Sequence, residues 1–364
     1  MAKQKNSTLA NIRENIDTID DQLLALLQDR LHLAKNIGRI KAKDNRDKWD
    51  PKREREIFER LLKANKEDFP EQPLLSIFRE IITTCRLSQK EVDVAYLGPE
   101  ATYSHLAGVK YFGHAATYKP IETIEDIFIE VERGRIEYGI VPVENSIEGA
   151  VTSTLDAFMK HKVKICGEVQ LEISHHLVNQ TGDIKDIKTV ASHSQPLAQC
   201  RQWLKKNLPG IPCQTVFSTG VASQMAAKDK SIAAIASSLA VKIYQLQVVT
   251  KGVEDYSGNT TRFFLIGRKS PSLSGKDKTS LLVGLRDKPG ALYDALTIFL
   301  ERNINLTRIE SRPAKGGAAW KYLFFIDMEG HIEDENVREG CEKLKNICSF
   351  YEWLGSYPQA LETT

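Results

Sequence analysis

The stretch "IRENIDTIDDQLLALLQDRLHLAKNIGRIK" (residues 12–41) decides how the first part of the chain folds. Its isoleucines and leucines recur in alternating steps of four and three, at positions 12, 16, 19, 23 and 26 and again at 33, 37 and 40. This spacing places them on one face of an α-helix. We predict one helix of about 35 residues, ~50 Å long at ~1.5 Å per residue. Its apolar face needs a partner to cover it.

Two shorter helices are predicted within the first 90 residues. Asp50-Pro51 is a good N-cap and first-turn pair, which opens a second helix that runs through Leu62. A third helix is predicted from about Pro73 to Gln89, with an apolar face along one side. Because three helices of such unequal length cannot fold compactly alone, the pattern predicts an all-α domain that forms a helical dimer.

Charged side chains interrupt the apolar stripe of the long helix. The stripe position after 26 holds Arg30, and Lys41 shares its face. Other polar side chains lie close to the expected helix contacts, namely Arg13, Arg53, Glu54, Cys85 and Gln89. Long side chains at helix edges can keep their charges in water, which is one interpretation. Unpaired charge in a dry interior is unfavourable, so several cations and one amide there suit a small dianion.

The helical part resembles the helical chorismate mutases. The resemblance is carried by R-E-x-I (13–16), L-L-x-x-R (26–30), G-x-x-K (38–41), D-x-x-R-E-R (50–55) and the closing L-x-Q (87–89). It implies an intertwined dimer in which Arg13 of the neighbouring chain, Arg30 and Arg53 hold the two carboxylates of chorismate. Lys41 and Gln89 would hydrogen-bond the ether oxygen whose bond breaks. Asp50 and Glu54 would meet the substrate hydroxyl, and Cys85 stands where some relatives carry a serine near a carboxylate.

Residues 91–269 show the alternation of strand and helix segments that is typical of α/β proteins. Short apolar segments alternate with helical stretches near 122–133, 196–206 and 219–228, which predicts a largely parallel sheet. The expected strands are "VDVAYLG" (92–98), "EYGIVPVE" (137–144), "KTVAS" (188–192), "SIAAIAS" (231–237) and "TRFFLIG" (261–267). Ligands of open α/β sheets bind at the carboxyl ends of strands, so the polar clusters there are the candidate site residues.

Four such clusters occur in the order found in prephenate dehydratases. They are "VAYLGPEATYSH" (94–105), "VPVENSIEGAVTSTLD" (141–156), "SHSQPLAQC" (192–200) and "EDYSGNTTRFF" (254–264). The resemblance implies a two-lobed, periplasmic-binding-protein-like domain, with residues of about 174–250 in the second lobe. Prephenate would lose its ring hydroxyl and ring carboxylate together in the cleft between the lobes.

The same resemblance assigns roles in the cleft. Thr261 would donate a hydrogen bond to the departing hydroxyl. Its polar partners around that hydroxyl would be Asn145 and Gln199, with Gln195 as a second candidate. The pocket would be lined or braced by Ser192, Ser146 and Arg262. Alternatively, Arg262 pairs with Glu144 or Asp255 as part of the scaffold.

Some residues in these clusters depart from the family pattern. Ala101 and Tyr103 stand where relatives often show Gly and Phe, and Ser194 stands where a proline is usual; these are changes of loop shape. His175 and His176 invite a metal or general-base interpretation. Because no acidic or cysteine partner lies at a suitable spacing, we favour a structural role or a contact between the lobes.

The C-terminal part resembles a regulatory domain. After the polar segment "KSPSLSGKDK" (269–278), which reads as a linker, residues 277–364 give a βαββαβ pattern, a ferredoxin-like α+β module. "RDKPGALYDAL" (286–296) and "IESRP" (309–313) resemble the ACT domain of prephenate dehydratases, which implies L-phenylalanine binding at a subunit interface. The positions carried over are Gly290, Ala291, Leu292, Glu310, Ser311, Arg312 and Pro313. Tyr293 stands where relatives usually have a small aliphatic residue.

Composition excludes several classes of protein. A length of 364 residues predicts two or three domains, and a net charge of +2 without a long basic run does not favour nucleic acid. No apolar run approaches the ~20 residues that span a bilayer, and the N-terminal "MAKQKNSTLANIREN" lacks the apolar core of a signal peptide. Six dispersed cysteines without metal-ligand spacing favour free thiols in a reducing cytosol.

We therefore expect a cytoplasmic bifunctional enzyme with domains at 1–90, 91–269 and 277–364. It would be at least dimeric, would need no metal or cofactor, and would be inhibited by L-phenylalanine. Two alternatives stay open. One is a dehydratase that prefers arogenate, the amino analogue of prephenate, and the other is a non-catalytic amino-acid sensor that uses the cleft for binding only.

Overall fold

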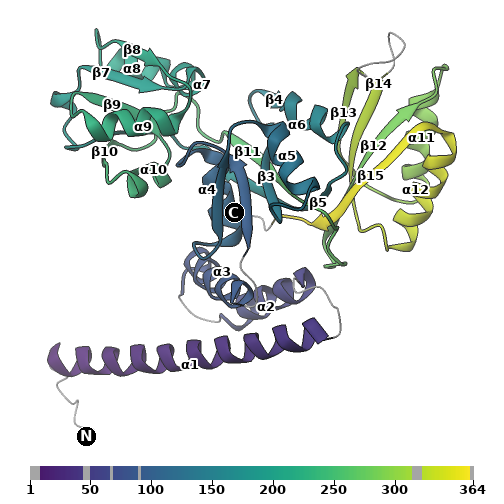
Figure 1. Ribbon diagram of the computed structural model, residues 1–364, viewed down its shortest axis with the longest axis horizontal. Helices are drawn as coiled ribbons and strands as arrows, with labels where there is room; N and C mark the ends of the chain where they lie inside the picture. Colours follow the sequence, from purple (N-terminus) through teal and green to yellow (C-terminus); the bar gives the residue numbers. More distant parts are fainter. Residues whose placement is uncertain (1–8, 44–49, 66–68, 89–91, 314–321, 361–364) are drawn as a thin grey trace, which may run out of the picture.

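The structure is a computed structural model that describes residues 9–43, 50–65, 69–88, 92–313 and 322–360. Three α-helices come first, then an α/β part with two separate sheets, then a four-stranded sheet with two helices. In Figure 1 the purple helices lie below the body, the green second lobe at one end and the yellow C-terminal helices at the other. The predicted fold class, with an all-α, a two-lobed α/β and a ferredoxin-like α+β part, is confirmed.

The helical part consists of α1 (Leu9–Lys43), α2 (Pro51–Ala64) and α3 (Glu71–Leu87). The predicted 35-residue helix is confirmed, and so is the cap of α2, because the Asp50 side chain accepts a hydrogen bond from the Arg53 N–H at 3.0 Å. Helix α1 runs as a rod beside α2 and α3 (Figure 1). Within one chain α1 buries only Ala34 and Gly38 of its described residues, so its apolar stripe stays exposed.

The first lobe of the α/β part has the strand order β2-β1-β3-β11-β5, with β4 paired to β3. Its strands are β1 (Asp93–Leu97), β2 (Thr117–Ile121), β3 (Tyr138–Asn145), β4 (Gly149–Ala150), β5 (Lys164–Glu172) and β11 (Thr260–Gly267). Its helices are α4 (Tyr103–Phe112), α5 (Ile124–Glu132) and α6 (Thr152–Phe158).

The second lobe has the strand order β10-β6-β9-β7-β8. Its strands are β6 (His176–Asn179), β7 (Thr189–Ser192), β8 (Cys213–Thr215), β9 (Ile232–Ala236) and β10 (Gln247–Thr250). Its helices are η1 (Ile184–Asp186), α7 (Ser194–Gln199), α8 (Arg201–Asn207), α9 (Thr219–Lys228) and α10 (Ser238–Ile243). The single helix predicted over 196–206 is thus two helices that meet at Cys200.

The prediction of a largely parallel sheet is wrong. Only the β1–β2, β1–β3, β7–β8 and β7–β9 pairs are parallel among the described strands. The chain crosses from the first lobe to the second after β5 and returns before β11, and β11 runs antiparallel to both β3 and β5. The returning strand β11 therefore makes the first sheet mixed, and β6, which runs antiparallel to β9 and β10, makes the second sheet mixed.

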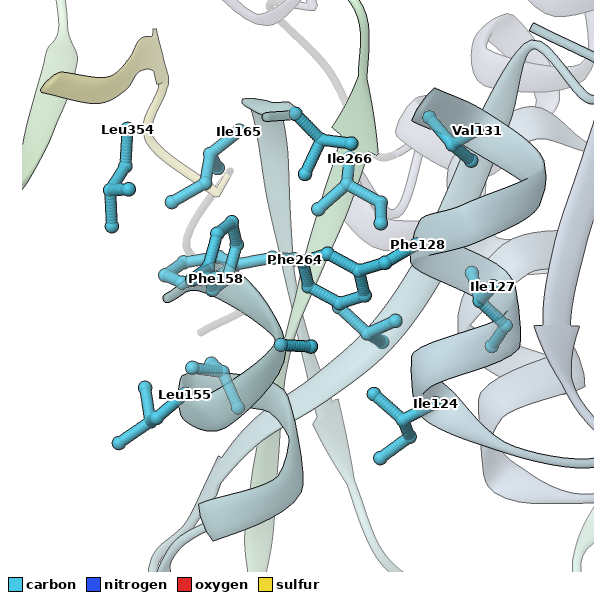
Figure 2. Packing of buried hydrophobic residues seen from close by; sticks show 14 of the residues in the cluster. Ile124, Ile127, Phe128, Val131, Leu155, Phe158, Ile165, Phe264, Ile266 and Leu354 are labelled. Carbon is cyan, nitrogen blue, oxygen red and sulfur yellow. The ribbon is translucent and has the colours of Figure 1, made fainter. Parts of the chain in front are cut away.

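The core of the first lobe forms around β11. Phe264 and Ile266 of β11 pack with Ile127 and Phe128 of α5 and with Phe158 of α6 (Figure 2). Leu354, which comes from the last strand of the chain, lies in the same cluster near Ile165. The C-terminal sheet is therefore packed into the core of the α/β part.

The C-terminal sheet has the order β13-β14-β12-β15, as predicted for a ferredoxin-like module. Its elements are β12 (Asp277–Leu285), α11 (Ala291–Leu300), β13 (Leu306–Pro313), β14 (Tyr322–Glu329), α12 (Glu335–Ile347) and β15 (Cys348–Pro358). Gly355 of β15 has φ +149°, and a Cβ there would lie 2.4 Å from the carbonyl oxygen of Ile165 on β5. Only glycine allows so close an approach between the two sheets.

The segment predicted as a linker, 269–278, is packed rather than loose. Ser274 and Asp277 are buried, and the Ser274 hydroxyl donates to the Asp277 carboxylate at 2.6 Å. The Ser270 hydroxyl donates to the carbonyl oxygen of Ser356, also at 2.6 Å. These polar side chains, which suggested a solvated linker, instead make hydrogen bonds within the fold: Ser274 with Asp277 of the same segment, and Ser270 with Ser356 of β15.

None of the helices described in the structure is long and apolar enough to cross a membrane.

Candidate active sites

A cleft of about 590 Å³ lies between the two lobes of the α/β part. The first lobe lines it with the ends of β1 and β3 and the start of β11, and the second lobe lines it with α7 and the start of α9. Four residues predicted for this site line the cleft together: Asn145, Gln195, Gln199 and Thr261.

Asn145, the last residue of β3, is oriented by the turn that follows it. Its Oδ1 accepts hydrogen bonds from the backbone N–H groups of Ile147 (3.0 Å) and Glu148 (3.1 Å). Backbone N–H groups only donate, so the other end of this amide must be the NH₂ group. That group donates to Oγ1 of Thr261 (2.8 Å) and to Oδ1 of Asn259 (2.7 Å).

Thr261, the second residue of β11, is left as a hydrogen-bond donor. It lies opposite Asn145 in the β3–β11 ladder, and its oxygen accepts the hydrogen bond from the Asn145 amide. Among the described residues none accepts the Thr261 O–H proton. Accepting one hydrogen bond strengthens a hydroxyl as a donor, so this proton can be given to an oxygen atom in the cleft.

His175 links the two lobes, as expected for an interlobe contact. It lies between β5 and β6, and its Nε2 is 2.8 Å from Oε1 of Gln199 in the second lobe. Its Nδ1 is 2.8 Å from the hydroxyl of Tyr103 in the first lobe. Burial lowers the pKa of His175, although Gln199 and Glu254 act in the opposite direction. Among the described residues no group of three or more His, Cys, Asp or Glu side chains could hold a metal ion.

The two predicted serines brace the cleft and do not line it. The Ser192 hydroxyl is fully buried and donates to the carbonyl oxygen of Ile235 at 2.8 Å. The Ser146 hydroxyl accepts from the Thr260 N–H at 2.9 Å and so holds the start of β11. Tyr103 and Asn259, in contrast, line the cleft although neither was predicted as a site residue. Both stand inside the quoted motifs, which is the signal that could have found them.

A second cavity, of about 460 Å³, lies between α1, α2 and α3. Six predicted residues line it: Arg30, Lys41, Asp50, Arg53, Glu54 and Cys85. Arg30 donates to the carbonyl oxygen of Ile81 (3.3 Å), and the Lys41 ammonium lies 3.9 Å from the Asp50 carboxylate. Arg53 is 61% exposed and pairs with Glu56 at 3.1 Å.

Sequence reasoning missed two further arginines of this cavity, Arg60 and Arg86. Arg86 lies four residues after Ile82 on α3, one turn along the same face, and this spacing was the available signal. Its guanidinium pairs with Glu54 at 3.0 Å and lies 5.5 Å from the ring centre of Phe112 in the α/β part. The lining therefore carries five cationic side chains against two carboxylates, which favours a dianionic ligand.

Arg13 is not among the described residues that line this cavity in one chain. Gln89 lies outside the described residues. Arg13 stands 17 residues before Arg30, the first α1 residue of the cavity lining, which is ~26 Å along the helix at ~1.5 Å per residue. It cannot reach the cavity of its own chain, and the prediction assigned it to the site of a neighbouring chain.

Comparison with known proteins agrees with this three-part architecture. Family models match chorismate mutase type II at residues 12–90, prephenate dehydratase at 94–271 and the ACT domain at 279–340. The bifunctional chorismate mutase/prephenate dehydratase of Aquifex aeolicus is 47% identical over 357 residues, which cover 97% of this chain and 98% of that protein.

The chain belongs to the bifunctional chorismate mutase/prephenate dehydratases.

Two further relatives support this assignment. The bifunctional chorismate mutase/prephenate dehydratase of Escherichia coli (strain K12) is 33% identical, with 97% of each chain covered. A crystal structure of the prephenate dehydratase from Arthrobacter aurescens in complex with L-Phe is 35% identical, with a TM-score of 0.68, and covers 74% of this chain and 90% of that one. The protein is thus an enzyme with a chorismate mutase domain, a prephenate dehydratase domain and an ACT domain.

Arg262 of the prephenate dehydratase domain does not line the cleft, so its prediction as a substrate-binding residue is wrong. Successive side chains of a strand point to opposite faces, and Arg262 follows Thr261 on β11. Its buried guanidinium pairs with Glu168 of β5 (2.7 Å) and with Asp327 of the ACT domain (2.6 Å), and it donates to the Tyr357 hydroxyl (3.2 Å).

The alternative partners predicted for Arg262 are also wrong. The Asp255 carboxylate accepts the backbone N–H groups of Gln202 (2.9 Å) and Trp203 (2.8 Å) at the start of α8. The Glu144 carboxylate lies 3.4 Å from the guanidinium of Arg308 in the ACT domain. Sequence alone could not rank these acids, because the true partners lie on strands far away in the chain.

The ion pair between Arg262 and Asp327 is held in a dry interface. Burial by itself would raise the pKa of Asp327, but Arg262, Ser280 and Arg308 outweigh it and hold the pKa of that carboxyl below its usual range. The Ser280 hydroxyl donates to the same carboxylate at 2.6 Å. Asp327 is therefore ionised at neutral pH and keeps the two domains paired.

The predicted effector residues gather at one end of the ACT sheet. Gly290 has φ +81° and starts α11, whose first turn holds Ala291 and Leu292. Glu310, Ser311, Arg312 and Pro313 end β13, the edge strand. In the ladder Arg312 and Gly284 both lie opposite Leu323, so the end of β13 and the turn into α11 share this end of the sheet. Arg312 pairs with Asp156 of α6 at 2.9 Å.

Proposed function

We propose that the chain converts chorismate to prephenate in the helical cavity and prephenate to phenylpyruvate in the interlobe cleft. We further propose that L-phenylalanine, the amino acid made from phenylpyruvate, inhibits the second step by binding to the ACT domain. The observation that carries the proposal is the Asn145–Thr261 pair, which leaves one hydroxyl donor at the mouth of β11.

The mutase step needs no nucleophile and no proton transfer. Its transition state needs a compact substrate conformation and positive charge near the breaking ether bond, which a preorganised cationic cavity supplies. Arg30 and Arg53 would bind the carboxylates, Lys41 and Gln89 the ether oxygen, and Asp50 and Glu54 the substrate hydroxyl. Cys85 would line the wall. The additional cation Arg86 would hold Glu54 in place, at the 3.0 Å contact.

The dehydratase step is driven by aromatisation of the ring. The bond between the ring and its carboxylate breaks, its electron pair enters the ring as CO₂ departs, and the carbon–oxygen bond of the ring hydroxyl breaks. The departing hydroxide needs a donor. Thr261 supplies a hydrogen bond to it while it takes up a proton that comes from the solvent, and it leaves as water. Because the product is far more stable, a neutral hydroxyl suffices, and such assistance is worth roughly 10²–10⁴-fold.

The amide side chains around Thr261 have separate roles. Asn145 uses both amide protons on Asn259 and Thr261, so it orients the donor and does not bind substrate itself. Gln199 and Gln195 line the second-lobe side and would bind the substrate oxygens from there.

We propose a homodimer that forms through α1. The apolar stripe of this helix is exposed within one chain, with Ile16 at 50%, Leu26 at 64% and Ile40 at 60%. So large an apolar surface needs a partner. A second copy is the natural one, since it would also bring the distant Arg13 into the cavity of the first chain.

Inhibition by L-phenylalanine is supported by contacts between the ACT sheet and the two catalytic strands. Asp327 binds Arg262, the neighbour of Thr261, and Arg308 contacts Glu144, the neighbour of Asn145. A shift of the ACT sheet on effector binding would therefore reach both strands directly. Feedback requires only that the effector binds two states of the ACT domain with different affinity.

The deciding experiment is a steady-state assay of the purified enzyme with chorismate and with prephenate, with and without L-phenylalanine. We expect phenylpyruvate from both substrates without added metal or cofactor, and less of it when L-phenylalanine is present. A folded protein that does not turn over prephenate would contradict the proposal and favour the sensor alternative. Arogenate as a third substrate decides between the two dehydratase specificities.

A further inference from the structure

A chain of hydrogen bonds runs along the cleft from Thr261 to Tyr103. Which group donates and which accepts in each of these bonds is determined at the Asn145 end. The two backbone N–H groups on Oδ1 of Asn145 orient that amide. Its NH₂ group donates to Oδ1 of Asn259 at 2.7 Å, so the NH₂ group of Asn259 points the other way. There it donates to Oε1 of Gln199 at 3.4 Å. Backbone geometry thus decides the orientation of three amides.

The same order of donors and acceptors determines which ring nitrogen of His175 carries a proton. Oε1 of Gln199 accepts, so Nε2 of His175, 2.8 Å away, must carry a proton. Burial favours the neutral ring by lowering the pKa of His175. A neutral ring protonated on Nε2 has an acceptor on Nδ1, and the hydroxyl of Tyr103 lies 2.8 Å from it. The carbonyl oxygen of Ser174, at 2.9 Å, competes for the same hydroxyl proton.

The chain of bonds leaves one group without a partner. Both described contacts to the Gln199 side chain, from His175 and from Asn259, fall on Oε1. Nε2 of Gln199 is buried and has no hydrogen-bond partner among the described residues. A buried donor without a partner is unfavourable by itself, so an oxygen atom of a ligand in the cleft would satisfy it.

We infer that Tyr103 and His175 are positioning residues of the dehydratase reaction, which hold the Gln199 amide with its NH₂ group directed to the oxygens of prephenate. Without the histidine donor the amide would hold its orientation only through the long contact with Asn259. His175 lies in the segment that crosses from the first lobe to the second. Its contacts with Tyr103 at the start of α4 and with Gln199 at the end of α7 therefore form only when both helices lie at the cleft. Tyr103 stands where relatives often carry phenylalanine, so its part is the smaller one. The inference rests on the proposed role of Gln199.

The test is the kinetics of the full-length enzyme with prephenate. His175→Phe keeps a ring and removes the donor, and we expect kcat to fall about tenfold with little change in KM, as for one lost hydrogen bond. His175→Gln restores an N–H donor and should recover most of the rate. Tyr103→Phe removes only the hydroxyl, so it should fold normally, and we expect kcat to fall about threefold.

A matched control and a double substitution separate positioning from a structural role. His176→Phe changes the neighbouring ring, which contacts the Gly252 N–H at 3.4 Å and does not line the cleft, so it should leave kcat unchanged. In a Gln199→Leu background, His175→Phe and Tyr103→Phe should have no further effect. The mutase rate and the melting temperature of each variant report on folding.

The outcomes distinguish this inference from the proposal on which it rests. If Gln199→Leu keeps full dehydratase activity, the proposed role of Gln199 is wrong, and the inference with it. If Gln199→Leu lowers the dehydratase rate but His175→Phe is as active as the wild type, only the inference is wrong. An effect of His175→Phe that persists unchanged in the Gln199→Leu background would also contradict it.

Discussion

At the scale of single residues, adjacent side chains on one strand point to opposite faces and have different roles. Thr261 faces the cleft and offers a proton, while Arg262 faces the ACT domain and is paired with two carboxylates. On β3, Glu144 likewise contacts the ACT domain, whereas Asn145 faces the cleft. A β-strand that is covered on both faces allows this, because its side chains alternate.

Replacement of Thr261 tests the proposed donor. Thr261→Ala should lower dehydratase kcat by roughly 10²–10⁴-fold, because the departing hydroxide loses its hydrogen bond. Thr261→Ser keeps the hydroxyl and should retain most of the rate. Mutase activity of both variants should equal that of the wild type, and its loss together with the dehydratase activity would contradict the separation of the two sites.

The protonation of His175 gives a prediction with a defined sign. Burial lowers its pKa, so the ring should remain mainly neutral at the ordinary histidine value of ~6.5. The unfolded chain then binds more protons than the folded one, so this group contributes stability above that value and loses it as pH falls through the folded pKa. An NMR titration of histidine-labelled enzyme, with His175→Gln for assignment, measures the midpoint. A midpoint at or above 6.5 would contradict the prediction.

At the scale of elements, α1 is the helix whose apolar face a single chain leaves uncovered. Its 35 residues carry Arg30 and Lys41 near one end and Arg13 near the other. A symmetric dimer would exchange these ends, since the same surface of both copies takes part. In the proposed dimer the length of the helix would serve the mutase site as well as the assembly.

Complementation tests this exchange. Arg13→Ala and Arg30→Ala should each abolish mutase activity. When the two variant chains are mixed and allowed to re-form dimers, about one quarter of the wild-type rate should return. Half of the dimers are then mixed, and each mixed dimer has one intact site of its two. Analytical ultracentrifugation confirms that dimers have formed. No recovery in mixed dimers would contradict the exchange of Arg13 between the two chains.

At the scale of the whole molecule, the ACT domain is built into the dehydratase domain. Leu354 lies in the core of the first lobe, and Gly355 allows β15 to approach β5 closely. The ion pairs of Arg262 and Arg308 cross the same interface beside Thr261 of β11 and Asn145 of β3. Such an interface can transmit a change in the ACT sheet to the cleft without a flexible linker.

Asp327→Asn tests this route. It keeps the shape of the side chain and removes its charge, and we expect the concentration of L-phenylalanine needed for half inhibition to rise about fivefold or more, a typical allosteric coupling. Calorimetry should show that L-phenylalanine still binds. Glu352→Gln is the matched control, because the Glu352–Lys164 pair (3.7 Å) crosses the interface away from Thr261 and Asn145. Equal effects of both variants would contradict a specific route.

Much of this architecture is determined by the sequence alone. The periodicity of α1, the Asp50 cap of α2 and the βαββαβ order of the C-terminal module are local patterns, because a helix or strand shows its buried face in its own residues. The resemblance to the prephenate dehydratases also placed Asn145, Gln195, Gln199 and Thr261 in one set, and these four do line one cleft.

Only the tertiary structure decided which way side chains point and what they meet. The partners of Arg262 lie 94 and 65 residues away, and the direction of the Gln199 amide depends on a turn more than 50 residues earlier. The reversal of β11 follows from the path between the lobes and has no local signal. Hydrogen bonds and ion pairs between distant strands form only once packing brings them together, so a sequence can name their donors and acceptors but not match them.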